Sequence, residues 1–179
     1  MLRLELALYP RHVYYLWMLE GAAAADWPAV WEQLRALGDV VALIDAAVVF
    51  HRHQLETAVQ VALSRHLAGR GRARHLHTEV VFALAAHRKI NEGLRLVGVA
   101  AATRRVLGVA VDASEDALEK LQRILRDAGA VSRDDGPDEA AFFRRLREDA
   151  DLQRIEQLYG VRPRAEAVCT LIAASGVAR

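Results

Sequence analysis

Short apolar segments of two kinds alternate along this chain, and their order restricts the folds it can adopt. Some segments are only a few residues long and either alternate with polar residues or are continuously apolar, as β-strands are; they occupy 2–6, 13–19, 40–44 and 106–111. In the others, apolar residues recur every three or four positions, as on one face of a helix; these occupy 27–37, 55–67, 78–86, 90–97, 114–125, 152–160 and 163–172. The pattern predicts an α+β fold, in which a small, mainly antiparallel sheet of about four strands packs with a helical layer of about six to eight helices.

Capping and breaking residues mark the ends of several of these segments. Pro10 separates the first two strands, which we expect to pair as a hairpin. Asp26 and Ser114 stand where side chains cap the start of a helix. Glycine, serine and proline recur from Asp127 to Asp138, so we expect one long loop there and two helices after it. At this length the chain, 1–179, is expected to form a single domain.

Several classes of protein are disfavoured by what the sequence lacks. The apolar runs fall far short of the roughly 18 to 20 residues that cross a bilayer, so we expect no membrane contact. The first residues carry an early acid and an alternating pattern, unlike the basic head and apolar centre of a signal peptide. The single cysteine, Cys169, can form neither an internal disulfide nor a multi-thiolate zinc site. We therefore expect a cytoplasmic protein.

Charge is strongly polarised along the chain although the net charge is only +1. Residues 51–106 contain ten Arg and Lys against three acids, a balance of +7. Residues 112–156 contain eight basic against thirteen acidic residues, a balance of −5. A basic centre beside an acidic flank predicts an anionic partner at one place rather than non-specific binding over the whole surface.

Within the basic centre, Arg70, Arg72 and Arg74 alternate with small residues directly after Gly69. Guanidinium groups bind phosphate in a planar, bidentate geometry, so this stretch could follow successive phosphates of an RNA strand. The alternative is an ordinary solvated loop. The two helical segments that follow could also form a DNA-binding helix-turn-helix, although the second, 90–97, offers few polar side chains for reading bases.

Catalytic and metal-binding patterns are weak. Five of the seven histidines cluster between residues 51 and 77, which leaves a histidine-dependent metal hydrolase as a third hypothesis; they are His51, His53, His66, His75 and His77. On a helix, His51 and His53 would lie on different faces. His75 and His77 would share a face of an extended segment, but the arginines before them repel a cation. No glycine-rich phosphate loop or nucleophile elbow is present. We expect no catalytic residues, no metal, no cofactor and no small-molecule substrate.

Five segments, followed by the strand expected at 106–111, keep an order and spacing typical of one known family over about 70 residues. They are Ile44-Asp45, His53-Gln54-Leu55-Glu56-Thr57-Ala58, Arg70-Gly71-Arg72-Ala73-Arg74, His77-Thr78-Glu79-Val80-Val81-Phe82-Ala83-Leu84 and Asn91-Glu92-Gly93-Leu94-Arg95-Leu96-Val97-Gly98-Val99. Together they resemble the TPRKB-like (CGI-121-type) accessory subunits of the KEOPS tRNA-modification complex. The sequence departs from that family's pattern at Ala86-His87-Arg88-Lys89, where Ser-Pro-x-x-Asn is common, and at Gly93, where alanine is common.

The resemblance implies a non-catalytic role in making threonylcarbamoyladenosine in tRNA. Such a subunit docks on the small kinase of the complex and holds the single-stranded CCA end of tRNA, while other subunits do the chemistry. On this hypothesis the RNA contacts come from phosphate-binding and hydrogen-bonding side chains in the basic centre: Arg70, Arg72, Arg74, His75, Thr78, Arg88 and Asn91. The kinase contacts come from apolar residues of the last two helices, which supply more apolar stripe than their own packing needs: Leu152, Ile155, Leu158, Val168, Leu171 and Ile172. The alternative is that these residues are simply buried in the core.

Overall fold

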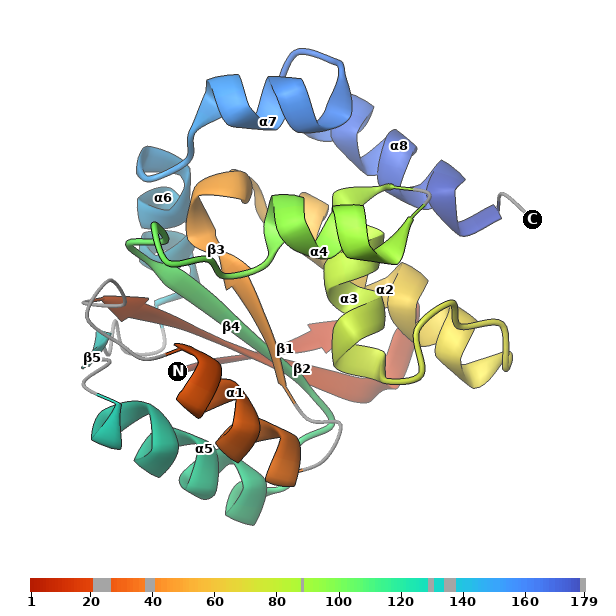
Figure 1. Ribbon diagram of the computed structural model, residues 1–179. Helices are drawn as coiled ribbons and strands as arrows, with labels where there is room; N and C mark the ends of the chain where they lie inside the picture. The colour runs from red at the N-terminus through yellow and green to blue at the C-terminus, as the bar shows by residue number, and fades with distance from the viewer. Residues whose placement is uncertain (21–26, 38–40, 88, 129–130, 134–137, 178–179) are drawn as a thin grey trace.

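The computed structural model describes residues 1–20, 27–37, 41–87, 89–128, 131–133 and 138–177, which form an antiparallel sheet with helices on both faces (Figure 1). The strands of this part of the chain are β1 (Leu2–Leu6), β2 (Tyr9–Glu20), β3 (Val41–Asp45), β4 (Val106–Val111) and the short β5 (Val131–Arg133). The helices are α1 (Trp27–Ala36), the 3-10 helix η2 (Ala46–Val48), α2 (Arg52–Leu67), α3 (Leu76–Ala85), α4 (Ile90–Val97), α5 (Glu115–Asp127), α6 (Glu139–Glu148), α7 (Leu152–Tyr159) and α8 (Ala165–Val177). The expected α+β fold is confirmed.

The four longer strands follow the order β1-β2-β4-β3, and each neighbouring pair is antiparallel. β1 pairs with the first part of β2 as the predicted hairpin, and β5 pairs with the last residues of β2. β1 alternates buried and exposed residues, as a strand with one covered face does, whereas β3 and β4 are buried throughout. Pro10 does not interrupt β2, because it stands at the start of that strand beside an irregularity in the pairing, where proline is tolerated.

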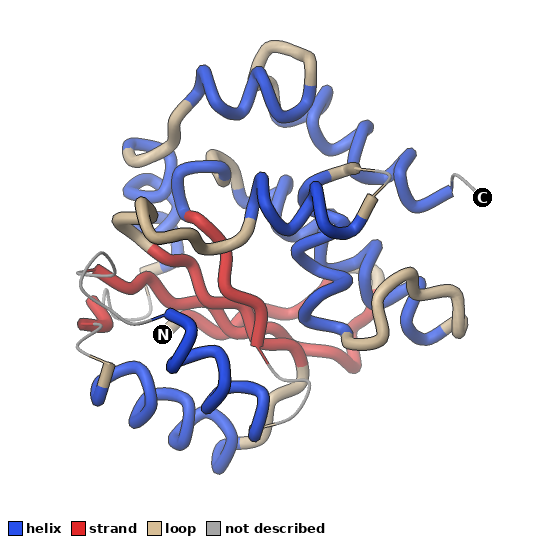
Figure 2. The backbone as a smooth tube through the Cα atoms, viewed as in Figure 1, coloured by secondary structure: helices blue, strands red, loops and turns tan. Residues whose placement is uncertain are grey.

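Helices lie on both sides of the sheet (Figure 2), and each face of the sheet carries its own hydrophobic core. One face supports α2, α3, α6, α7 and α8 through a large core that includes Leu16 and Ile44. The other face is covered by α1 and α5, which pack on a smaller core around Trp17 and Leu43. The indole of Trp17 lies so close to Gly108 on β4 that an added methyl group would fall 2.1 Å from it, so only glycine fits there.

Two expectations about the last third of the chain need correction. The stretch from Asp127 to Asp138 is not wholly a loop, because 131–133 pair with β2; residues 129–130 and 134–137 lie outside the described part. Three helices follow it rather than two. The additional helix, α6, is capped by Asp138, whose side chain accepts a hydrogen bond from the Ala141 amide, and it buries Phe142 and Leu146. The rest of α6 is rich in arginine, so its apolar stripe consists of these two residues alone. Sequence periodicity did not detect so short a stripe.

Of the two predicted helix caps, Ser114 is confirmed. Its hydroxyl accepts a hydrogen bond from the Ala117 amide at the start of α5. The predicted cap Asp26 lies outside the described residues. No helix in the described part of the chain has the length and apolar character that a bilayer crossing needs.

Candidate nucleic-acid interface and partner surface

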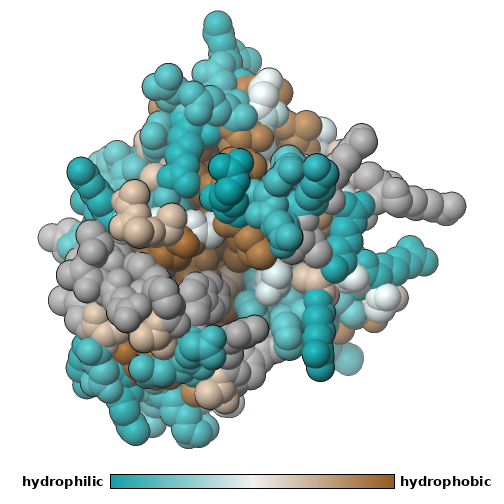
Figure 3. Space-filling view, viewed as in Figure 1, coloured by the Kyte–Doolittle hydropathy of each residue, from teal (hydrophilic) through white to brown (hydrophobic). Residues whose placement is uncertain are grey.

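The three alternating arginines lie on the connection between α2 and α3, which we call the arginine loop (residues 69–75). The loop leaves α2 through Gly69, whose φ of +64° is a left-handed conformation that glycine adopts without strain. The Arg70 amide then donates to the Arg65 carbonyl at 2.8 Å. Arg70, Arg72 and Arg74 are all exposed, so the loop presents three guanidinium groups on one short segment. Hydrophilic side chains project from the side of the molecule where α2 ends and α3 begins (Figure 3).

A buried carboxylate holds this loop in place. Glu79, in the first turn of α3, has no exposed surface. Its Oε2 atom accepts hydrogen bonds from the amides of Arg72 at 2.9 Å and of Ala73 at 2.8 Å. Its Oε1 atom accepts from Nη1 of Arg65 at 2.8 Å. Both oxygens of the acid are therefore satisfied, as burial of a charged group requires.

Arg65 completes the anchor from the side of α2. Its side chain is 8% exposed, and its second guanidinium nitrogen donates to the carbonyl of Ser175 in the last turns of α8. The guanidinium carbons of Arg65 and Arg72 lie 5.8 and 5.6 Å from the centre of the Phe82 ring, within the range of cation–π attraction. Arg72 is thus held at both its backbone and its side chain.

The remaining residues proposed to contact RNA fall into two places. His75 precedes α3 and stacks on His77, with ring centres 5.5 Å apart, and Thr78 lies in the first turn of α3 beside the loop. Asn91 is exposed, but it lies at the start of α4, beyond the far end of α3. Ten residues of helix span about 15 Å, so Asn91 is separated from the arginine loop by the length of α3. Arg88 lies outside the described residues.

Among the clustered histidines, His51 has a defined structural role. Nδ1 of His51 accepts the His53 amide at 3.1 Å and so caps the start of α2. Burial, followed by the nearby His53 and Arg147, lowers the pKa of His51, which favours the neutral ring that this cap requires. In the described part of the chain no three His, Cys, Asp or Glu side chains come together as metal ligands. Burial raises the pKa of the Cys169 thiol, which disfavours the reactive thiolate.

The apolar residues of the last two helices divide between core and surface. Ile155, Val168 and Ile172 are completely buried within this chain, so the expectation that they face a partner must be corrected: they stabilise the core. Leu158 and Leu171 are half-buried. Leu152 is 51% exposed. Of the six apolar residues, only Leu152, Leu158 and Leu171 are therefore accessible to a partner.

The exposed side of α8 mixes polar and small apolar residues. Glu166 and Thr170 are exposed on it, together with Ala173 and Ala174. Residues three or four positions apart share a face of a helix, so Ala167 and Ala174 lie beside Leu171, and all three are at least partly exposed. These three residues form the apolar strip of α8 that a partner could contact.

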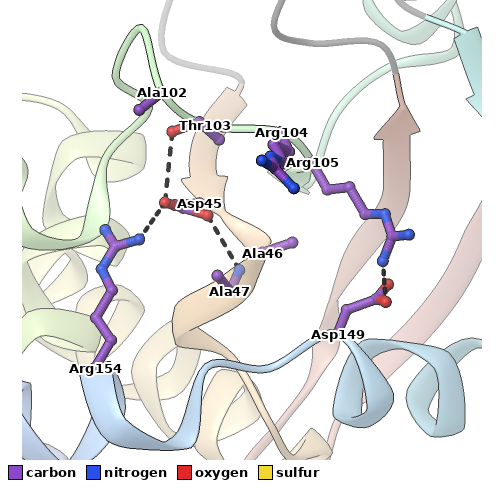
Figure 4. Close-up of a pocket in the computed structure, with 9 residues that line it drawn as sticks. All are labelled: Asp45, Ala46, Ala47, Ala102, Thr103, Arg104, Arg105, Asp149 and Arg154. Atoms are coloured by element: carbon purple, nitrogen blue, oxygen red, sulfur yellow. Dashed lines mark hydrogen bonds and ion pairs between the residues drawn. The ribbon is translucent and has the colours of Figure 1, made fainter.

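A second group of arginines lines a cavity of about 360 Å³ between the ends of β3 and β4 and the α6–α7 connection (Figure 4). Nη1 of Arg154 lies 2.5 Å from Oδ2 of Asp45, and Arg105 pairs with Asp149. Arg154 also donates to the Leu96 carbonyl at 2.9 Å. These contacts join α6 and α7 to the sheet, so two of the cavity's arginines are already engaged within the chain.

Comparison with known proteins identifies the family. A family model described as kinase binding protein CGI-121 matches residues 28–176. The chain belongs to the CGI-121 family. The EKC/KEOPS complex subunit cgi121 of Aspergillus fumigatus is 36% identical over 75 residues, which cover 42% of this chain and 40% of the fungal protein. The EKC/KEOPS complex subunit CGI121 of Coccidioides immitis is 29% identical over 75 residues, covering 42% of this chain and 36% of its own length.

The family assignment confirms the resemblance to CGI-121-type KEOPS subunits that the middle of the sequence indicated. The matched segments span well under half the length of either fungal relative. Sequence reasoning missed the two residues that organise the arginine loop, Glu79 and Arg65. The available signal was Glu79 itself, an acid that directly precedes the apolar run Val80 to Ala86 and is one of only three acids in the basic centre.

Proposed function

We propose that this CGI-121 family member is a non-catalytic adaptor subunit of a KEOPS-type complex in the cytoplasm. In this proposal it binds the kinase of the complex and the single-stranded CCA end of tRNA, and so supports threonylcarbamoyladenosine modification. The family description and the names of the fungal relatives support the kinase and the complex. The proposed RNA contact depends on one observation: three exposed arginines on a loop that Glu79 anchors from inside the protein.

The loop suits a single strand better than a duplex. Its arginines stand at every second position of one short segment. Such a linear array can follow one phosphate backbone. His75 and His77 stack beside it, and aromatic rings next to a cationic groove can stack with unpaired bases. Arg70 and Arg74 are exposed, so their charge can reach an anionic partner.

Binding measurements with matched nucleic acids test the RNA part. We expect intact tRNA to bind more tightly than tRNA lacking its CCA end, and both to bind more tightly than duplex DNA of equal length. A chelator should change none of these affinities. Equal affinity for duplex DNA would favour the helix-turn-helix regulator instead, and an affinity that changes with chelator would favour the metal hydrolase.

The proposed kinase surface consists of Leu152, Leu158 and Leu171 together with Ala167 and Ala174, which lie beside Leu171 on α8. Neighbouring substitutions on α8 test it. We expect Leu171→Asp to abolish co-purification with the kinase while the thermal unfolding curve stays cooperative, because this side chain is half-buried at the surface. Ile172→Asp places an unpaired charge in the core and should unfold the protein. If Leu171→Asp retains full kinase binding, the kinase docks on another surface.

A further inference from the structure

The carboxylate of Glu79 connects the buried core to the surface segment that carries the exposed arginines. An acid with no exposed surface is costly unless it is paired and hydrogen-bonded. Here one oxygen pairs with Arg65, and the other accepts two consecutive loop amides. Hydrogen bonds to two consecutive amides restrict the backbone dihedral angles between them, so Glu79 determines the conformation of residues 72 and 73.

The surrounding backbone leaves the loop little other freedom. A methyl group added at Gly71 would lie 3.2 Å from the carbonyl oxygen of Ala73, so the turn is tight at this point. Ala73 is half-buried, whereas Arg72 and Arg74 on either side of it are exposed. The anchored conformation therefore turns the small residue inward and the arginines outward.

We propose that Glu79 is a positioning residue for RNA binding, which acts by fixing the arginine loop in its RNA-competent conformation before RNA arrives. This inference rests on the proposed function, because it assumes that the arginine loop contacts tRNA. Ordering a flexible backbone upon binding reduces affinity, whereas a preorganised loop avoids that cost. Release of the loop should therefore weaken tRNA binding about tenfold, a factor that corresponds to ordering roughly one residue.

A matched pair of double variants isolates the anchor from the ion pair. Arg65→Met with Glu79→Gln removes both charges, but the glutamine carbonyl oxygen can still accept the Arg72 and Ala73 amides. Arg65→Met with Glu79→Met removes the same charges and offers no acceptor. Neither variant leaves an unpaired buried charge, so both are expected to fold.

The expected result is that only the Glu79→Met double variant loses about tenfold in tRNA affinity. The slope of log affinity against log salt concentration should stay the same in both double variants, because the arginines remain and still neutralise the same phosphates. Hydrogen exchange at the Arg72 and Ala73 amides should be faster in the Glu79→Met double variant alone. Equal tRNA affinity in the two double variants, with faster exchange in one, overturns the proposal.

The unmodified protein provides a test that does not depend on the variants folding. Its Arg72 and Ala73 amides should exchange much more slowly than amides of an exposed loop, and rapid exchange at both overturns the proposal. The variant Arg70→Ala/Arg72→Ala/Arg74→Ala separates this inference from the proposed function. If that variant binds tRNA normally, the RNA assignment itself fails; if it binds weakly while the Glu79→Met double variant binds normally, only the positioning role fails.

Discussion

The arginine loop and the cavity beside β3 and β4 are both rich in arginine, but the structure uses the two groups differently. In the cavity, Arg154 and Arg105 are paired with Asp45 and Asp149, which come from other elements. In the loop, the arginine side chains are exposed, and the acid that serves the loop binds its backbone amides. The difference shows that a count of positive charge cannot separate arginines that join elements of the fold from exposed arginines such as Arg70 and Arg74.

The largest expected effect is on stability at the cavity. Arg154→Met leaves the buried Asp45 carboxylate without its ion pair and should lower the free energy of unfolding by about 2 kcal/mol. Arg104→Met is the matched control: this side chain is exposed at the same cavity, and its loss should change stability by no more than about 0.5 kcal/mol. Urea unfolding monitored by circular dichroism measures both. Equal stability of the two variants would mean that the Asp45–Arg154 pair contributes nothing to the fold.

The opposite behaviour is expected of the loop, where binding should change and stability should not. Replacing Arg70, Arg72 and Arg74 by alanine removes three phosphate contacts, so the slope of log affinity for tRNA against log salt should flatten by about 2. The free energy of unfolding should change by at most about 1 kcal/mol, mainly from the Arg72 contact with Phe82. Salt titrations of tRNA binding provide the measurement.

Arg104→Ala serves as the control for that titration because its guanidinium is also exposed but lies at the cavity. We expect it to leave the slope unchanged. If Arg104→Ala flattens the slope and the triple variant does not, RNA binds around Arg104 and Arg105, and the roles of the two regions are reversed.

Most of the fold followed from periodicity, because the residues that define it contact their near neighbours in sequence or face a core. The hairpin of β1 and β2, the buried strands β3 and β4, and the Ser114 cap of α5 were all predicted. The helix α6 was missed because its buried face is only Phe142 and Leu146. The strand β5 was missed because three residues carry too little pattern to distinguish them from a loop.

The candidate sites were harder to predict because they depend on contacts between distant residues. The alternation of arginines was visible in the sequence, but their anchoring through Glu79 joins α2, the loop and α3. The apolar stripe of the last two helices was also visible. Periodicity could not divide it into the core residues Ile155, Val168 and Ile172 and the more exposed Leu152, because both kinds recur on adjacent helical positions.

The smallest expected effect concerns communication between the loop and the proposed kinase surface. Arg65 binds Glu79 with one nitrogen and the Ser175 carbonyl of α8 with another, so the loop anchor extends to the helix that we propose the kinase covers. A partner that stabilises the last turns of α8 stabilises this contact as well, and the coupling of two sites typically corresponds to a factor of about five or more. Adding the kinase should therefore slow hydrogen exchange at the Arg72 and Ala73 amides about fivefold.

The Ala117 amide is the reference for this measurement, because it donates to the Ser114 hydroxyl at the start of α5, on the face of the sheet opposite α7 and α8. Its exchange should not respond to the kinase, and the Leu171→Asp variant should show no response at either place. The Ala47 amide, which donates to Asp45, reports on the cavity. If the kinase binds and slows exchange at Ala47 but not at Arg72 and Ala73, the cavity rather than the arginine loop is coupled to the partner. The double variant Arg65→Met/Glu79→Gln keeps an acceptor for the Arg72 and Ala73 amides but removes the link to the Ser175 carbonyl. It should therefore abolish the response of the loop even where kinase binding is retained.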